Sequence, residues 1–283
     1  MSGFDPTWLA LREPADHGSR NADLQDRVAA RFGKRRDLLV LDLGCGTGSN
    51  LRALAPLLPE HQFWRLVDHD PALLEAARER LQAWADEAED GPGGELILTK
   101  GPRTIRVRLE QADLRAGVAP LLSPAPGLVT ASALFDLVSP GWMANFARDV
   151  AASKATFYTV LTYDGEAAWD DPPHPADAAV LEAFHTHQRG DKGFGAAAGP
   201  DADTALRQAF EAAGYVCEEA DSAWVLGPAE HALIGQLVSG IAQAAAEAGP
   251  IPAEEAQAWA AARSTSRRVV IGHKDLLAIP RKR

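Results

Sequence analysis

The chain has 283 residues, of which 46% are hydrophobic and 24% charged, an ordinary globular composition that argues against disorder. Its net charge of -11 repels polyanions, so we expect no nucleic-acid partner, and the short basic runs 34–36 and 281–283 are typical of solvated surface. No apolar stretch is long enough to span a bilayer, no signal peptide is recognisable, and the two cysteines, Cys45 and Cys217, form neither a disulfide framework nor a metal site. We therefore expect a soluble cytoplasmic protein without membrane contact.

The most informative segment is a glycine-rich turn that follows the first expected strand. An apolar run over residues 38–43 leads into Gly44, Gly46 and Gly48, and a helical pattern begins at Ser49. This order predicts a strand, a tight turn and a helix, with glycines where the backbone approaches a ligand and with free N–H groups at the helix start. A dinucleotide-binding fingerprint would need glycine at position 49, so this spacing disfavours a nicotinamide-dependent dehydrogenase. A tight turn without a ligand is the structural alternative.

A second buried strand is expected over residues 63–68, and it ends in Asp68, 20 residues after Gly48. Asp70 and Pro71 then supply the N-cap and first residue of a helix, so Asp68 is the better candidate for binding a ligand. The acidic, glycine-rich segment 86–94 is expected to be a surface loop. Residues 95–100 and 103–109 alternate on either side of a turn, which predicts a hairpin.

Further strands are expected at 128–132 and 156–162, with a helix near 142–152 between them. Strands that alternate with helices predict a parallel, doubly wound sheet whose ligand lies at the carboxyl ends of the strands. Beyond strand five the sequence predicts helices near 176–187, 202–213, 228–246 and 253–263, and strands near 215–219, 223–226 and 268–279.

The segment Asp42-x-Gly44-x-Gly46-x-Gly48 resembles motif I of the class I S-adenosylmethionine-dependent methyltransferases. The resemblance covers about residues 37–162 and continues more loosely to the end. It implies a seven-stranded Rossmann-like sheet, mostly parallel with an antiparallel last strand. It also implies an N-terminal helical segment (1–36) that closes over the cofactor, and a methyltransferase domain (37–283) with cap insertions at about 163–200 and 228–265.

In that family the residues at matching positions hold S-adenosylmethionine. The resemblance assigns the methionine and ribose site to the first strand end and its turn, the ribose hydroxyls to Asp68, the adenine amino group to Asp113, and the surroundings of the reactive methyl to the loop after the fourth strand. Arg12 or Arg20 would pair with the methionine carboxylate, because a guanidinium suits a planar oxyanion. The cofactor-binding set is Asp42, Gly44, Cys45, Gly46, Gly48, Asp68, His69, Asp113, Leu114, Ser132 and Arg20.

Candidate groups for substrate binding or base catalysis lie in the first insertion. They are Tyr163, His185, His187 and Asp191. The alternative is that this loop-rich segment is simply an exposed polar loop without a functional role. The two histidines, two residues apart, point to different sides of a helix or strand and make a poor metal pair.

The expected reaction is in-line methyl transfer to a small-molecule acceptor, giving S-adenosylhomocysteine, with oxygen, nitrogen and carbon acceptors all open. The segment 132–136 lacks the Asn-Pro-Pro-aromatic box of methylases that act on base amino groups. Two further alternatives are a same-fold enzyme with non-methylating chemistry and a non-catalytic, cofactor-binding regulatory protein. An oligomer is possible but is not indicated.

Overall fold

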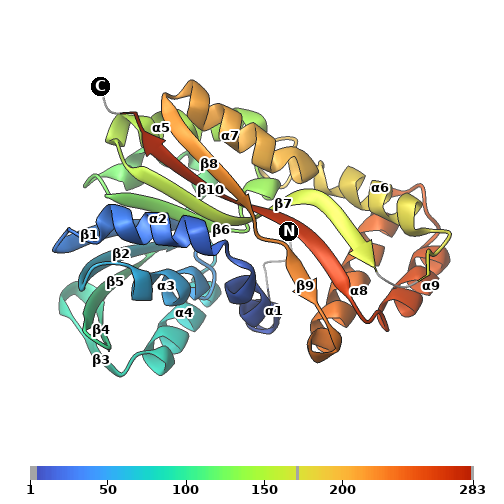
Figure 1. Cartoon of the computed structure of the whole chain (residues 1–283), viewed down its shortest axis with the longest axis horizontal. Helices are drawn as coiled ribbons and strands as arrows, with labels where there is room; N and C mark the ends of the chain where they lie inside the picture. The colour runs from blue at the N-terminus through green and yellow to red at the C-terminus, as the bar shows by residue number, and fades with distance from the viewer. Residues whose placement is uncertain (1–4, 170–171, 282–283) are drawn as a thin grey trace.

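Ten strands form one sheet in the computed structural model, which describes residues 5–169 and 172–281 (Figure 1). Their spatial order is β3-β4-β5-β2-β1-β6-β7-β10-β8, and β9 pairs with β10. The strands are β1 (Asp37–Leu43), β2 (His61–Asp68), β3 (Glu87–Asp90), β4 (Leu96–Lys100), β5 (Arg103–Gln111), β6 (Leu128–Ser132), β7 (Thr156–Trp169), β8 (Tyr215–Asp221), β9 (Trp224–Leu226) and β10 (Val269–Pro280).

Five neighbouring strands, β5, β2, β1, β6 and β7, are parallel, and β10 runs antiparallel between β7 and β8. The expected parallel core with an antiparallel last strand is therefore confirmed, but the sheet has ten strands rather than seven, because β3, β4 and β9 add antiparallel pairs to it. Chain order reverses between β1 and β6, because β2 lies on one side of β1 and β7 on the far side of β6. In open α/β sheets, ligands bind at such a switch point, beyond the carboxyl ends of the strands.

Helices cover both faces of the sheet. The helices α2 (Ala22–Phe32), α3 (Ser49–Leu54) and α4 (Pro71–Trp84) pack on one face, whereas α5 (Pro140–Ser153) and α7 (Ala202–Ala212) pack on the other. Alternate residues of β1 divide between these two cores: Val40 belongs to the first and Leu41 to the second. Asp70 accepts a hydrogen bond from the Ala72 N–H at 2.8 Å, which confirms its expected capping role.

Three further helices gather at one end of the molecule, at the right of Figure 1. There α6 (Asp177–Gln188), α8 (His231–Ala248) and α9 (Ala253–Arg263) pack together beside the far halves of β7 and β10. Asp177 joins two of them, because its Oδ1 accepts from Trp259 Nε1 and from Arg263 Nε, each at 2.9 Å.

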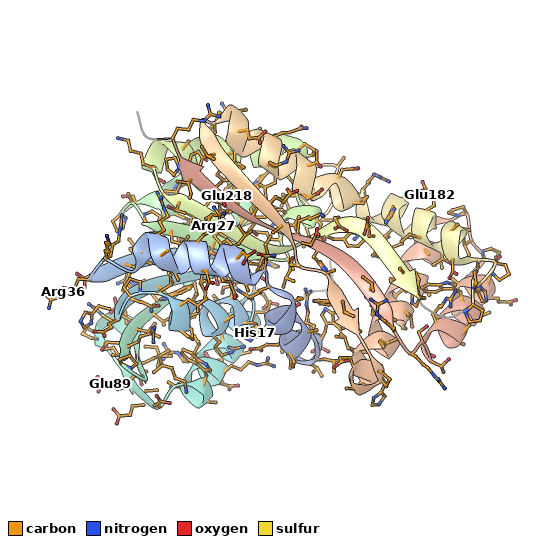
Figure 2. The ribbon with its side chains drawn as sticks, in the orientation of Figure 1. His17, Arg27, Arg36, Glu89, Glu182 and Glu218 are labelled. Carbon is orange, nitrogen blue, oxygen red and sulfur yellow. The ribbon has the colours of Figure 1, made fainter. Side chains whose placement is uncertain are left out.

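The helix α1 (Pro6–Ser19) lies beside β9. Arg27 of α2 pairs with Glu218 of β8 at 2.5 Å (Figure 2).

Two expectations are corrected. The segment 86–94 is not entirely a loop, because β3 within it pairs with β4 as an exposed edge strand. The sequence did not predict this strand, because its residues are mostly charged and show no alternation of apolar and polar side chains. The fifth strand is longer than expected: β7 continues to Trp169, since β10 pairs along its whole length. The hairpin of β4 and β5 is confirmed. Short 3-10 turns lie at Ala55–Leu57, Pro92–Gly94, Leu114–Ala116, Ala119–Leu122, Phe135–Leu137, Gly199–Asp201 and Pro228–Glu230.

Within the described residues, no helix is long and apolar enough to cross a membrane.

Candidate functional site

The glycine-rich turn joins β1 to α3 and requires backbone conformations that favour glycine. Gly44, Gly46 and Gly48 have φ values of 62°, 52° and 74°. A Cβ at Gly44 would lie 3.3 Å from Leu134 and one at Gly46 would lie 3.2 Å from Leu9. The Gly46 N–H donates to Asp68 Oδ2 at 2.9 Å, which fixes the turn against the end of β2.

A cavity of about 380 Å³ opens beside this turn, at the carboxyl ends of β1, β2, β5 and β6. Eight of the eleven residues expected to bind the cofactor line it, namely Gly44, Cys45, Gly46, Asp68, His69, Asp113, Leu114 and Ser132. The wall is completed by residues that include Leu9, Arg12, Asp16, Thr47, Asn50, Leu73, Arg115, Leu134, Lys192 and Phe194. The strand ends thus bring together side chains that are far apart in the sequence.

Asp68 is held rigidly at the rim of this cavity. Its side chain is buried, and its second oxygen, Oδ1, accepts from the Asp70 N–H at 3.0 Å. The His69 ring lies 3.3 Å from the same oxygen. Because each carboxylate oxygen has two acceptor sites, Asp68 retains capacity for ligand hydroxyl groups after these bonds are made.

Asp113 lies at the end of β5 and faces Arg115, which also lines the cavity. The Arg115 Nε and backbone N–H donate to Asp113 Oδ1 at 2.8 and 2.9 Å. The hydrogen bonds from Arg115 lower the pKa of Asp113 to about 2. A ligand amino group here has to share this carboxylate with Arg115.

Asp42, Gly48 and Arg20 do not line the cavity. Arg20 and Asp42 lie behind its wall, where Arg20 Nη1 donates to Asn50 Oδ1 and Asn50 Nδ2 donates to Asp42 Oδ1, both at 2.8 Å. Asp42 is completely buried, and burial raises its pKa to about 7. Of the two arginines considered for a methionine carboxylate, the structure places Arg12, and not Arg20, at the cavity wall.

The helix α1 is fastened to the elements around the cavity. Glu13 accepts from Arg52 Nε and Nη2 at 2.9 and 2.6 Å. The ring of His17, which is labelled in Figure 2, lies 2.9 Å from Ser49 Oγ. Asp16 accepts from the Trp224 indole N–H at 3.1 Å. Through these contacts α1 holds Leu9 and Arg12 over the glycine-rich turn.

A second cavity, of about 170 Å³, lies between the sheet and the helical end of the molecule. It has Arg12, Ala133 and Leu137 in common with the first cavity, so the two adjoin at the loop after β6. Most of its lining is apolar, from residues that include Trp8, Leu161, Ala167, Phe184, Trp224, Leu237, Ile241 and Ile271; its polar side chains are Arg12, Asp136, Tyr163, Gln188 and His273.

The four candidate catalytic residues do not converge. Tyr163 lines the second cavity, and its hydroxyl lies 3.0 Å from His185 Nε2. His187 points elsewhere and pairs with Glu247 of α8 at 3.2 Å. Asp191 Oδ1 accepts from the Gly193 and Gly195 N–H groups, a loop-shaping role that places Phe194 and Lys192 at the first cavity.

Sequence reasoning missed several cavity residues. Asn50 and Arg115 follow recognised motifs by only a few positions, so extending each motif by those positions would have included them. Gln188 likewise directly follows the candidate His187, whereas His273 carried no such signal, because it lies on the last strand, far in sequence from every recognised motif. Within residues 5–169 and 172–281, no cluster of three or more His, Cys, Asp or Glu side chains is arranged to bind a metal ion.

Residues 41–96 match the model of a family described as a methyltransferase domain. No curated protein sequence matches the chain. Among solved structures, a cyclopropane-fatty-acyl-phospholipid synthase-like protein from Lactobacillus casei is 13% identical, with a TM-score of 0.55 over 98% of this chain and 95% of that chain. The cyclopropane synthase MmaA2 from Mycobacterium tuberculosis is 12% identical, with a TM-score of 0.50 over 97% and 94% of the two chains. The YcgJ protein from Bacillus subtilis is 13% identical, with a TM-score of 0.50 over 93% and 100%. At such identities the likeness establishes the fold alone.

Proposed function

We propose that the chain is a class I S-adenosylmethionine-dependent methyltransferase that transfers a methyl group to a small-molecule acceptor; the match of residues 41–96 to a methyltransferase-domain model and the fold support this proposal. The observation that carries the proposal is the convergence of the glycine-rich turn and Asp68 on one cavity at the topological switch point of the sheet.

The cavity has the size and the chemistry for this cofactor. Its volume of about 380 Å³ falls within the range of small-molecule sites, and apolar and polar side chains line it together, among them Asp68 and Asp113 at the strand ends and Arg12 on α1. Asp68 would accept hydrogen bonds from the two ribose hydroxyls, and Asp113 would accept one from the adenine amino group. Arg12 would face the methionine carboxylate, with Arg20 acting from behind through Asn50.

When bound, the cofactor supplies an electrophilic methyl group on a sulfonium, whose sulfur keeps the electron pair of the broken C–S bond. The protein's part is to orient the acceptor in line and to exclude water. The apolar second cavity, adjoining the first through Ala133 and Leu137, supports a bound acceptor and thus an enzyme more than a purely regulatory protein.

Calorimetric titration with S-adenosylmethionine and S-adenosylhomocysteine tests the proposal on the wild type and on Asp68→Asn. Replacing the carboxylate weakens hydrogen bonds to the ribose, so we expect a loss of affinity of about tenfold to about a hundredfold, or ~1.5–3 kcal/mol. Asp70→Ala is the matched control, because Asp70 caps α4 and does not line the cavity. It should cost about 1 kcal/mol of stability and leave the affinity unchanged.

Absence of binding to the wild type would refute the cofactor assignment. Binding that is equal in wild type and Asp68→Asn would refute the role of Asp68. The product distinguishes the remaining alternative, since methyl transfer releases S-adenosylhomocysteine and non-methylating chemistry on this cofactor releases other products.

A further inference from the structure

We propose that the second cavity is the acceptor site, that its ligand is a small, uncharged ring compound bearing an ionisable hydroxyl group, and that Asp136 takes the hydroxyl proton. This inference rests on the proposed function, and it assigns a substrate class and a base that the sequence did not indicate.

The size and lining of the cavity favour one ring. A dry cavity of about 150 Å³ lined by aliphatic and aromatic side chains is enough to bind benzene, and this one measures about 170 Å³. Two aromatic side chains line it from different elements: Trp224 from β9 and Phe184 from α6. The Arg12 guanidinium pairs with Asp16 at 2.9 Å and lies over the Trp224 ring at 4.9 Å, and its remaining donors are assigned to the methionine carboxylate in the first cavity, so it calls for no anionic ligand in the second.

Two buried polar atoms in the lining call for a ligand with a polar group. Gln188 Oε1 and His273 Nδ1 are screened from solvent and have no hydrogen-bond partner in the part of the chain that the structure describes. Leaving such groups unpaired is costly, and a ligand can recover part of the cost. A hydroxyl that donates its proton to Asp136 can accept from His273 Nδ1 in the tautomer in which this nitrogen carries the ring proton, whereas Gln188 Oε1, which only accepts, is satisfied by a second donor on the ligand. The site thus combines an apolar body with a few polar contacts, the usual composition of a small-molecule site.

Asp136 lines the second cavity close to its junction with the first. It belongs to the loop that forms the wall between the two cavities, with Ala133 and Leu137 facing both. Its neighbour Phe135 is buried on the other side against Phe146 and Phe157, with ring centroids 5.4 and 5.5 Å apart, so the carboxylate is held on a rigid support.

Backbone strain concentrates at the same place. Ala133 and Leu161 adopt φ values of 50° and 60°, which are unfavourable for residues with a Cβ, and both line the second cavity. Such strain is retained mainly at functional sites, where the surrounding structure imposes it.

The protonation state of Asp136 suits proton abstraction near neutral pH. Burial raises its pKa to about 6, with the Arg12 charge opposing the shift. The other titratable groups facing it do not compete: burial lowers the pKa of His273 to about 3 and raises the pKa of Tyr163 far above neutrality. On abstraction the O–H bond breaks, its electron pair stays on oxygen, and the proton passes to Asp136 and later to solvent. The oxygen is then the nucleophile toward the methyl group.

Phenol is the probe, and its affinity is measured by ligand-observed NMR with S-adenosylhomocysteine present. Ala167→Leu on β7 fills the cavity and should weaken phenol binding by at least about tenfold. Ala168→Leu is the matched control, because Ala168 is the exposed next residue of the same strand and does not line the cavity. Both variants should bind S-adenosylhomocysteine as the wild type does, since neither residue lines the first cavity.

The pH dependence tests Asp136. An ionised carboxylate accepts the phenol hydroxyl hydrogen bond better than a protonated one, and phenol itself ionises only near pH 10, as tyrosine does. Wild-type affinity should therefore fall severalfold as the pH is lowered from about 7.5 to about 5, whereas Asp136→Asn should bind with little pH dependence.

The outcomes separate the two proposals. If S-adenosylhomocysteine does not bind the wild type, the proposed function fails. If it binds, but phenol does not bind or binds Ala167→Leu as tightly as the wild type, the acceptor-site assignment fails. An identical pH dependence in wild type and Asp136→Asn overturns the role of Asp136 alone.

Discussion

At the scale of single residues, the candidate site depends on backbone shape as much as on side-chain chemistry. The turn after β1 has three glycines in left-handed conformations, and its Gly46 N–H is fixed by the same Asp68 that lies at the cavity rim. Shape and chemistry are therefore coupled, because a change in the turn displaces the carboxylate and a change in the carboxylate loosens the turn.

Gly46→Ala tests this coupling. A Cβ at φ 52° is strained and would lie 3.2 Å from Leu9, so we expect a loss of about 1–2 kcal/mol in stability together with weaker cofactor binding. Gly18→Ala is the control: it lies in α1, where a Cβ meets nothing within 4 Å, and it should raise stability by up to about 1 kcal/mol. Urea denaturation measures both, and equal effects of the two substitutions would contradict the argument.

At the scale of elements, α1 closes one side of the cavity through a few charged contacts. The pair of Glu13 with Arg52 is the strongest of these, because it has two hydrogen bonds and the guanidinium is buried. We propose that α1 acts as the closing segment over the cofactor, as expected for residues 1–36 from the sequence.

Glu13→Gln should destabilise the protein by about 1–3 kcal/mol, because it leaves the buried Arg52 charge without its counter-ion. Glu211→Gln breaks the exposed pair of Arg207 and Glu211, 3.2 Å apart, and should cost less than about 0.5 kcal/mol. Hydrogen exchange should further show faster opening of α1 in Glu13→Gln only. A uniform change across the protein would argue against a local role.

The same contact has a defined pH dependence. Burial tends to raise the pKa of Glu13, but the hydrogen bond and charge of Arg52 outweigh burial and leave the pKa below 4.5. The stabilisation is therefore present above pH 4.5 and is lost as the pH falls through the lowered pKa. Burial and the Arg20 charge lower the pKa of His17, so acidification below 6.5 also favours the unfolded state. The stability difference between wild type and Glu13→Gln should shrink in acid.

At the scale of the whole molecule, the two cavities adjoin at the loop after β6, beyond the carboxyl ends of the strands. Residues of α1 line both cavities, and α6 and α8 border the second. Ligand binding and folding are linked there, because a ligand that binds only the folded protein raises its stability. The helices α6 and α8 matter to this linkage, since Phe184 and Gln188 of α6 and Leu237 and Ile241 of α8 line the second cavity.

S-adenosylhomocysteine at about a hundred times its dissociation constant should stabilise the protein by ~2.7 kcal/mol. For a chain of this size the corresponding rise in Tm is about 4–5 °C. Scanning calorimetry measures it, with Asp68→Asn at the same ligand concentration as the comparison. A Tm that does not respond in the wild type would contradict specific binding to the folded state.

The amino-acid sequence by itself determined the parallel core, the glycine-rich turn, the cap at Asp70 and the strand-end acids at positions 68 and 113. These follow from short-range patterns, since alternating or helical periodicity and turn chemistry act over a few residues. The tertiary structure alone decided that Arg12 and not Arg20 reaches the first cavity, that His185 and His187 diverge, and that Asp136 and His273 face one apolar cavity. The physical reason is that a cavity is made where distant segments fail to fill space, and which side chains border it depends on long-range packing that no local pattern encodes.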